Sequence, residues 1–156
     1  MRVAFGTTVL ERGLAQNAVD GIGNYSRELL RRLNDTKELE LAPFVYSSEL
    51  RNRGLISEAV DFGPFKPQAL FSLISGRSFP IAAQRVSDRI DLVHATDHLI
   101  PRLRKTPVVA TLMDAIPLAH PEWVTYSFRG MKNALWRQSA SWADHVVTIS
   151  EHAKQE

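Results

Sequence analysis

The chain has 156 residues, of which 44% are hydrophobic and 23% are charged, and it contains no cysteine. This length and composition fit one globular domain with a single core, and the missing cysteine excludes a disulfide framework and a thiolate metal site. The formal net charge is only +2, and a nucleic-acid-binding protein would need a larger basic excess, so we expect no nucleic-acid partner.

Short apolar strands alternate with helical segments along the chain. The residue pattern predicts strands at 2–5, 39–46, 91–95, 107–113 and 145–149, helices at 25–33, 65–75, 80–89 and most of 121–142, and a mixed segment at 55–62. Turn formers and charges predict flexible regions at 6–20, 47–54 and 62–80. Strands that are apolar on both faces and separated by helices indicate a parallel sheet covered on both sides, so the predicted fold is α/β, a Rossmann-like doubly wound sheet.

The end of the sequence reads as a junction between a strand and a helix. Strand 145–149 leads to Ser150, a favourable N-cap, and Glu151 would lie in the first turn of the new helix. An α/β domain that closes in this way usually continues into another. We therefore expect residues 1–156 to be a single domain, one half of a larger protein.

Two glycines lie at the start of the first predicted helix. Gly21 and Gly23 would let the backbone approach a ligand, and a helix start offers free N–H groups to an anion. The alternative is a glycine turn that serves only tight packing. A dinucleotide fingerprint fits badly because a third glycine is missing and the pair lies about fifteen residues beyond the first strand, so we do not expect a dehydrogenase.

Polar side chains follow two of the predicted strands. His94 and Asp97 come at the end of strand 91–95, and Asp114 follows strand 107–113. An imidazole or a carboxylate at this edge can act as a base or bind a sugar hydroxyl, although each could also cap a turn. A metal site is not expected, because His94 and His98 lack further ligands at suitable spacing.

Four segments in this order resemble the N-terminal half of GT-B glycosyltransferases of the retaining family 4 type. They are Gly21-Ile-Gly-Asn-Tyr with its following helix, Asp91-Leu-Val-His, Val109-Ala-Thr-Leu-Met-Asp-Ala-Ile-Pro-Leu-Ala-His-Pro, and Ala143-Asp-His-Val-Val-Thr-Ile-Ser-Glu. The resemblance implies that a hexose, for example mannose, is transferred from a nucleotide-sugar to a glycan or lipid-linked acceptor in surface polysaccharide biosynthesis. It also implies a C-terminal nucleotide-sugar-binding domain that is outside this sequence.

The resemblance also implies roles for individual residues. Gly21, Gly23, Asn24 and Ser150 would approach the donor diphosphate, whereas His94, Asp97 and Asp114 would line the acceptor side and carry the catalytic contacts. Many relatives have histidine where this chain has Met113, and a thioether cannot exchange a proton. We expect no metal ion and no cofactor besides the donor substrate.

The segment 62–79 mixes aromatic residues with Lys66 and Arg77. If Phe65, Phe71 and Phe79 are exposed, this segment suits peripheral contact with an anionic membrane; otherwise it is a buried helix. No apolar run approaches the roughly 18 residues of a membrane span and no signal peptide is visible, so we expect a cytoplasmic protein. Non-catalytic carbohydrate- or partner-binding modules, and other nucleotide-binding α/β proteins such as epimerases, remain alternatives.

Overall fold

The computed structural model describes residues 1–50, 59–86, 89–114, 116–123, 125 and 127–155. Within these residues six strands form one sheet, and every neighbouring pair is parallel. The strands, in the sheet order β3-β2-β1-β4-β5-β6, are β3 Val60–Asp61, β2 Glu40–Val45, β1 Arg2–Gly6, β4 Leu92–Ala95, β5 Val108–Leu112 and β6 His145–Thr148. The predicted Rossmann-like α/β fold is therefore confirmed.

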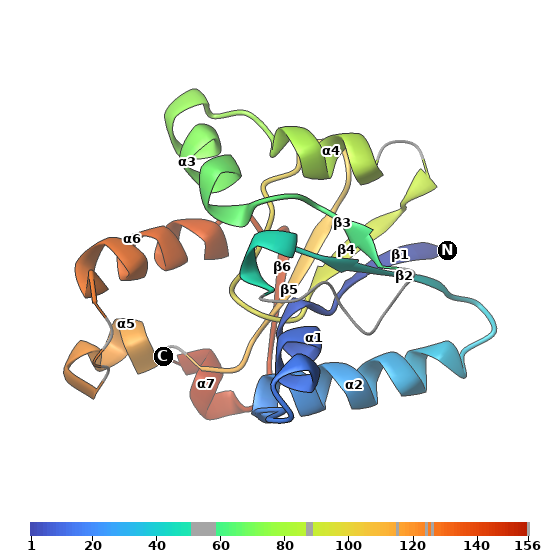
Figure 1. Ribbon diagram of the computed structural model, residues 1–156, viewed down its shortest axis with the longest axis horizontal. Coiled ribbons are helices and arrows are strands. Elements are labelled where there is room, and N and C mark those ends of the chain that lie inside the picture. The colour runs from blue at the N-terminus through green and yellow to red at the C-terminus, as the bar shows by residue number, and fades with distance from the viewer. Residues whose placement is uncertain (51–58, 87–88, 115, 124, 126, 156) are drawn as a thin grey trace.

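Helices connect the parallel strands and cover both faces of the sheet. Figure 1 shows α3, α4 and α6 on one side of the sheet and α1 and α2 on the other. The helices are α1 Thr8–Ala15, α2 Gly21–Asn34, α3 Phe65–Ser75, α4 Pro80–Val86, α5 Ile116–Ala119, α6 Arg129–Ala140 and α7 Glu151–Gln155, with 3-10 turns η1 Ser47–Glu49 and η3 Pro121–Trp123. This arrangement leaves the carboxyl ends of all strands at one edge, where such sheets bind ligands.

Aromatic side chains fill the core between the sheet and α3 and α4. The rings of Phe44 and Phe62 stack with their centroids 4.0 Å apart, and Tyr46 and Phe79 are fully buried beside them. Each such ring removes about 150–250 Å² from water, at about 25 cal/mol per Å², so this cluster contributes strongly to the free energy of folding. The cluster fixes α3 against β2 and thereby positions the start of α3 at the ligand-binding edge.

The first crossover differs from the prediction, which was wrong for residues 6–20. The structure has helix α1 where a flexible loop was expected. Val9 and Leu10 are buried, and a Cβ on Gly13 would lie only 2.9 Å from the Cα of Val19, so α1 packs tightly against the residues that lead into α2. The sequence pattern missed this short helix because only one turn of it carries buried apolar side chains.

Helix α2 begins earlier than predicted, at Gly21 rather than residue 25. Asp20 is its N-cap, and the Oδ1 atom of Asp20 accepts a hydrogen bond of 2.8 Å from the Gly23 N–H. Glycine has low helix propensity, but an aspartate cap stabilises a helix start by about 1 kcal/mol. The two glycines therefore form the first turn of a helix and not a loop.

The remaining elements follow the predicted order. Helix α3 has the predicted bounds 65–75, although region 62–80 was also expected to be flexible, and the helix predicted at 121–142 is divided into η3 and α6. Helix α6 starts after Phe128, whose φ of 59° lies in the left-handed region and ends the preceding turn. The parts of the predictions for residues 51–58 and 87–88 fall outside the described residues.

Two of the three phenylalanines considered for membrane contact are buried. Phe65 and Phe79 belong to the core, as the buried-helix alternative expects, whereas Phe71 is 41% exposed. The exposed apolar side chains of α3 are instead Leu70, Phe71, Leu73 and Ile74. Helix α3 thus presents one apolar face to the core and a second one to solvent.

Candidate functional site

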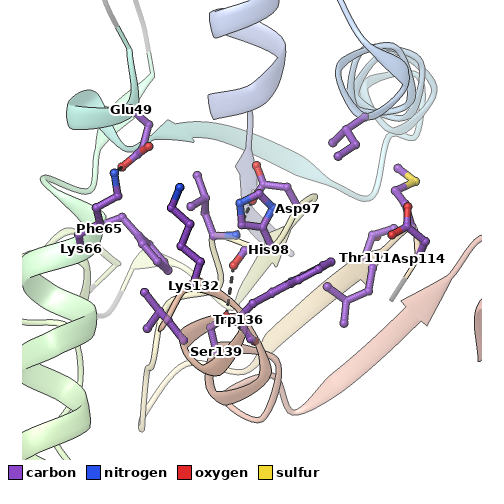
Figure 2. Close-up of a pocket in the computed structure, with 15 residues that line it drawn as sticks. Glu49, Phe65, Lys66, Asp97, His98, Thr111, Asp114, Lys132, Trp136 and Ser139 are labelled. Carbon is purple, nitrogen blue, oxygen red and sulfur yellow. Dashed lines mark hydrogen bonds and ion pairs between the residues drawn. The ribbon is translucent and has the colours of Figure 1, made fainter. Parts of the chain in front are cut away.

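A cavity of about 530 Å³ lies outside the carboxyl ends of β4 and β5, and we call it the main cavity. Helix α6 forms one wall, and the starts of α2 and α3 and the turn η1 complete it (Figure 2). It is lined by Ile22, Glu49, Phe65, Lys66, Asp97, His98, Leu99, Thr111, Leu112, Met113, Asp114, Lys132, Leu135, Trp136 and Ser139. Apolar walls with a few polar groups are typical of sites for small organic ligands.

Asp97 lies in the wall formed by the residues after β4. Its side chain is 6% exposed, and its Oδ1 atom accepts a hydrogen bond of 2.7 Å from the Leu99 N–H. Burial raises the pKa of Asp97, while His98, the Leu99 N–H and Arg12 lower it. Because Asp97 lines the cavity, its carboxyl group can form a hydrogen bond with a ligand hydroxyl.

Helix α6 contributes a stripe of residues that the sequence prediction did not identify. Lys132, Leu135, Trp136 and Ser139 recur at three- and four-residue spacing, which places them on one helix face toward the cavity. The Ser139 hydroxyl donates to the carbonyl oxygens of Trp136 at 2.9 Å and His98 at 3.3 Å. This spacing was the available signal in the sequence for a helix face that lines a site.

The imidazole of His98 meets the indole of Trp136 edge to face. Their centroids are 5.7 Å apart and the ring planes are inclined by 68°. Figure 2 shows the indole of Trp136 extending from α6 below His98 toward Thr111. The two rings therefore give the main cavity an aromatic surface on which a flat apolar face of a ligand can rest.

Asp114 lies where two cavities meet. With Met113 it lines both the main cavity and a second cavity of about 410 Å³. The Oδ1 atom of Asp114 accepts a hydrogen bond of 3.1 Å from the Ile116 N–H, as expected for a turn-capping aspartate. The second cavity is lined by Met113, Asp114, Ile116, His120, Trp123, Ser150, His152 and Ala153.

His94 lies within β4 and outside the residues that line either cavity. Its Nε2 atom is 2.9 Å from the Thr111 hydroxyl, which in turn is 3.2 Å from the hydroxyl of Tyr25 on α2. The Phe5 ring packs edge to face against the imidazole, and burial lowers the pKa of His94. The sequence prediction placed His94, Asp97 and Asp114 together. In the structure Asp97 and Asp114 line the main cavity, whereas His94 is linked to it through the Thr111 hydroxyl.

The residues predicted to meet the donor are spread over two places. Gly21 and Gly23 occupy the first turn of α2, where a Cβ on Gly23 would lie 2.8 Å from the Val19 side chain and one on Gly21 would meet nothing within 4 Å. The Asn24 side chain bonds to Arg27 at 2.7 Å and to the Val19 carbonyl at 3.4 Å. The packing role considered for the glycines thus applies to Gly23.

Ser150 is the predicted donor residue that lies at a cavity. Its hydroxyl accepts a hydrogen bond of 3.1 Å from the Ala153 N–H and so caps α7, as the sequence predicted. Ser150 also lines the second cavity, together with Asp114. Asp114 and Ser150, each two residues beyond the end of its strand, are therefore brought to one place.

Among the described residues there is no group of three or more histidine, aspartate or glutamate side chains that could hold a metal ion. None of the helices built from them has both the length and the apolar character needed to cross a membrane.

Comparison with known proteins identifies the family to which this chain belongs. No curated protein and no solved structure matches the chain. The family model of Glycosyltransferase Family 4 matches residues 19–156, a stretch that contains α2, the strands from β2 onward and all residues that line the two cavities. Because this match extends over most of the sequence, and the fold is a Rossmann-like parallel sheet with cavities at its carboxyl edge, the chain belongs to glycosyltransferase family 4.

Proposed function

We propose that this chain is the acceptor-binding half of a retaining GT-B glycosyltransferase. The intact enzyme moves a hexose, with mannose as the first candidate, from a nucleotide-sugar to a glycan or lipid-linked acceptor in surface polysaccharide biosynthesis. The observation that carries this proposal is the main cavity, where Asp97, Asp114 and Trp136 converge outside the carboxyl ends of parallel strands in a family 4 chain.

The chemistry of transfer explains why such a cavity suits the acceptor. An acceptor hydroxyl oxygen forms a bond to the anomeric carbon of the donor, and the bond from that carbon to a phosphate oxygen breaks. Asp114 would hold the reacting hydroxyl because it lies at the junction of the two cavities. Asp97 would orient another hydroxyl through its second oxygen, and Trp136 would support the sugar ring.

The second cavity suits the transferred sugar and the nearer part of the donor. It shares Met113 and Asp114 with the main cavity and includes Ser150. In this proposal most donor contacts, including those to the nucleotide, come from a second domain beyond this sequence, and no metal ion or further cofactor takes part. The enzyme works in the cytoplasm, and α3 carries the apolar surface through which it contacts the membrane.

Chemical-shift mapping tests the acceptor site directly. Titration of the isotope-labelled chain with methyl α-mannoside and short mannosides should shift the amide resonances of Leu99, Thr111 and Trp136. Amides far from the cavity, such as those of Arg31 and Ala83, serve as internal controls. Shifts confined to surfaces away from the main cavity, or no shifts with any glycan, would contradict the proposed function.

A further inference from the structure

The hydroxyl group of Tyr46 lies in the core, yet none of the described residues forms a hydrogen bond with it. Tyr46 directly follows β2 and is 0% exposed, and its Oη atom is shielded from solvent. The ring packs edge to face against Phe44, Phe62 and Phe65 at centroid distances of 5.8, 6.1 and 5.1 Å. Phenylalanine would keep these ring contacts without burying an unpaired polar group, so packing does not explain a tyrosine here.

Tyr46 and Asp97 lie at the same level of the sheet, on either side of β1. The Tyr46 N–H donates to Oγ1 of Thr8 at 3.1 Å, directly beyond β1 and Thr7. The Thr96 hydroxyl donates to the Gly6 carbonyl at 2.8 Å, at the end of the same strand. The residues that follow β2 and β4 are therefore both bonded to the carboxyl end of β1.

The two side chains also lie on the same face of the sheet. Tyr46 is two residues beyond Phe44, and Asp97 is two residues beyond Ala95, and both of these preceding residues belong to the core. Phe65 contacts the Tyr46 ring and lines the main cavity together with Asp97. Burial, and next the charge of Asp97, raises the pKa of Tyr46, as expected when a carboxylate lies near the phenol.

The carboxyl group of Asp97 has an oxygen that can complete a link to Tyr46. Oδ1 accepts the hydrogen bond from the Leu99 N–H, whereas no described residue donates to Oδ2. The charged groups that act on Asp97 are those of His98, Arg12 on α1 and Glu49 in η1. None of these forms a hydrogen bond with Oδ2 in the part of the chain that the structure describes.

We propose that Tyr46 is a positioning residue for Asp97, through a buried water molecule that accepts a hydrogen bond from the Tyr46 hydroxyl and donates one to Oδ2 of Asp97. A buried water needs two or more polar partners, and these two groups supply them. The bridge fixes the carboxyl plane at the wall of the main cavity. A carboxylate oxygen accepts two hydrogen bonds, so Oδ2 can still bind a ligand hydroxyl. This last consequence rests on the proposed function, in which Asp97 orients an acceptor hydroxyl.

A crystal structure of the chain tests the water directly. We expect density for one water within about 3 Å of both Oη of Tyr46 and Oδ2 of Asp97. A direct contact between these two oxygens, or a site without density, would overturn the bridge.

Urea denaturation tests whether the hydroxyl has a partner. Tyr46→Phe should lower the urea midpoint if the water bridge exists, whereas an unpaired hydroxyl predicts an equal or higher midpoint, because phenylalanine buries no polar group. Tyr25→Phe is the matched control, since it removes a tyrosine hydroxyl with a known partner, the Thr111 hydroxyl at 3.2 Å. Its loss of stability gives the size expected for one satisfied hydroxyl.

The titration of Asp97 gives a readout that a purely structural role would not change. The bridge stabilises the ionised carboxyl, so Tyr46→Phe should raise the pKa of Asp97 further, as measured by the carbon-13 shift of its carboxyl group. The charges of Arg12, Glu49 and His98 remain in this variant and in the control variant, which should leave the titration unchanged. An unaltered Asp97 titration in Tyr46→Phe would contradict the proposal.

A second substitution tests the pair from the other side. In Asp97→Asn the amide oxygen can keep the hydrogen bond from the Leu99 N–H, while the NH₂ group takes the place of Oδ2 and no longer accepts from the water. Tyr46→Phe should then lower the urea midpoint less than it does in the unchanged chain. Losses that simply add would show that Tyr46 and Asp97 are not coupled.

Binding of methyl α-mannoside separates this inference from the proposed function. Tyr46→Phe should weaken that binding about two- to tenfold, the effect of one ordinary hydrogen bond. If no mannoside binds the unchanged chain, the proposed function fails, while the crystal structure, the urea midpoints and the titration still decide the link between Tyr46 and Asp97. If mannosides bind the unchanged chain and Tyr46→Phe equally well, the positioning role is wrong.

Discussion

His94 is partly buried between β1, β5 and α2, and its environment predicts how the free energy of unfolding depends on pH. Burial lowers the pKa of His94 in the folded chain, whereas in the unfolded chain the group titrates near its usual value of about 6.5. The unfolded state therefore binds a proton first as pH falls. The contribution of His94 to the free energy of unfolding is therefore complete above about pH 6.5, and it is lost as the pH falls below that value.

We therefore expect the chain to be less stable at pH 5.5 than at pH 7.5, with His94 responsible for part of the loss. Urea denaturation at both values should show a smaller loss for His94→Gln, which keeps a polar partner for the Thr111 hydroxyl. His145→Gln, at an exposed position on β6, is the matched control. An unchanged pH dependence in His94→Gln would show that this imidazole is not the group that titrates.

Asp114 and Met113 are neighbours in sequence and line the same cavities, yet they should contribute differently to transfer. In the intact enzyme, Asp114→Ala should reduce kcat/KM by about one to three orders of magnitude, since a hydrogen bond to a charged group is worth about 1.5–3 kcal/mol and a catalytic base more. Met113→Ala should cost far less, because a thioether supplies only packing. Steady-state kinetics on both variants measure the difference.

Folding must be separated from catalysis for this pair. Asp114→Asn keeps an oxygen that can accept from the Ile116 N–H, so it should retain the thermal stability that Asp114→Ala loses. If the Met113→Ala enzyme is well folded but has no transfer activity, while the Asp114→Ala enzyme remains active, our assignment of these roles is wrong.

The sequence predicted site residues from their position at or just after the ends of strands. Asp97 and Asp114 were predictable because polar residues that follow parallel strands meet at one edge. His94 was misplaced because it lies within β4, where alternate side chains point to opposite faces of the sheet; Val93 and Ala95 face the core, whereas His94 contacts the Thr111 hydroxyl. Trp136 and Lys132 were missed because they approach the site from a helix that is distant in sequence, and an amphipathic stripe does not reveal what it faces.

At the scale of elements, the start of α2 offers a matched pair of glycines. Gly23→Ala should destabilise the fold, because its Cβ would lie 2.8 Å from the Val19 side chain and α2 would have to shift. Gly21→Ala should be neutral or stabilising by up to about 1 kcal/mol, because nothing lies within 4 Å of its Cβ and alanine has the higher helix propensity. Thermal or urea denaturation of the two variants measures both effects.

This comparison tests whether α2 needs its glycines for packing or for a ligand. Equal stability of Gly23→Ala and the unchanged chain would contradict the packing role. The prediction of a glycine-rich phosphate loop was reasonable from the residues alone, since a helix N-cap and a ligand-facing turn use the same residue types. Only the three-dimensional position of Val19 distinguishes the two.

Helix α3 should account for any binding to anionic vesicles. Its exposed Leu70, Phe71, Leu73 and Ile74 adjoin a basic cluster, since Arg102 donates to the Ser72 carbonyl at 3.2 Å and Arg104 to the Gly76 carbonyl at 2.9 Å. Apolar side chains flanked by cations suit the surface of an anionic leaflet.

We expect the chain to sediment with vesicles that contain anionic lipid, less so at high salt, and less after Leu70→Ser with Ile74→Ser. Met131→Ser removes an exposed apolar side chain from a different helix and is the control. Equal recovery in the supernatant with and without vesicles would show that the outer face of α3 does not bind lipid.

At the scale of the whole molecule, alternating strands and helices predicted the fold class because parallel strands need long crossovers. The sheet order could not be derived from the residues. Nothing in the sequences of β1 and β4 indicates that they pair, and this adjacency follows from long-range packing of the finished sheet. The short helix α1 carries few buried apolar side chains, and part of its support comes from Val19, which precedes α2.

A division of labour between two domains predicts that this chain alone folds but does not turn over a sugar nucleotide. Calorimetry with nucleoside diphosphates should show Kd values well above 1 μM. Such values correspond to a binding free energy weaker than about 8 kcal/mol. Sub-micromolar binding, or hydrolysis or transfer of guanosine diphosphate mannose by the chain, would show that the donor site does not depend on another domain.

The central position of β1 has a consequence for how the protein is made. Val3 pairs with Leu41 on one side and with Leu92 on the other, so β1 completes its hydrogen bonding only after β4, far along the sequence, has been synthesised. Until then the apolar residues Val3 and Phe5 have one open strand edge beside them. A growing chain of this protein therefore passes through a long interval in which its first strand is available to chaperones and to wrong partners.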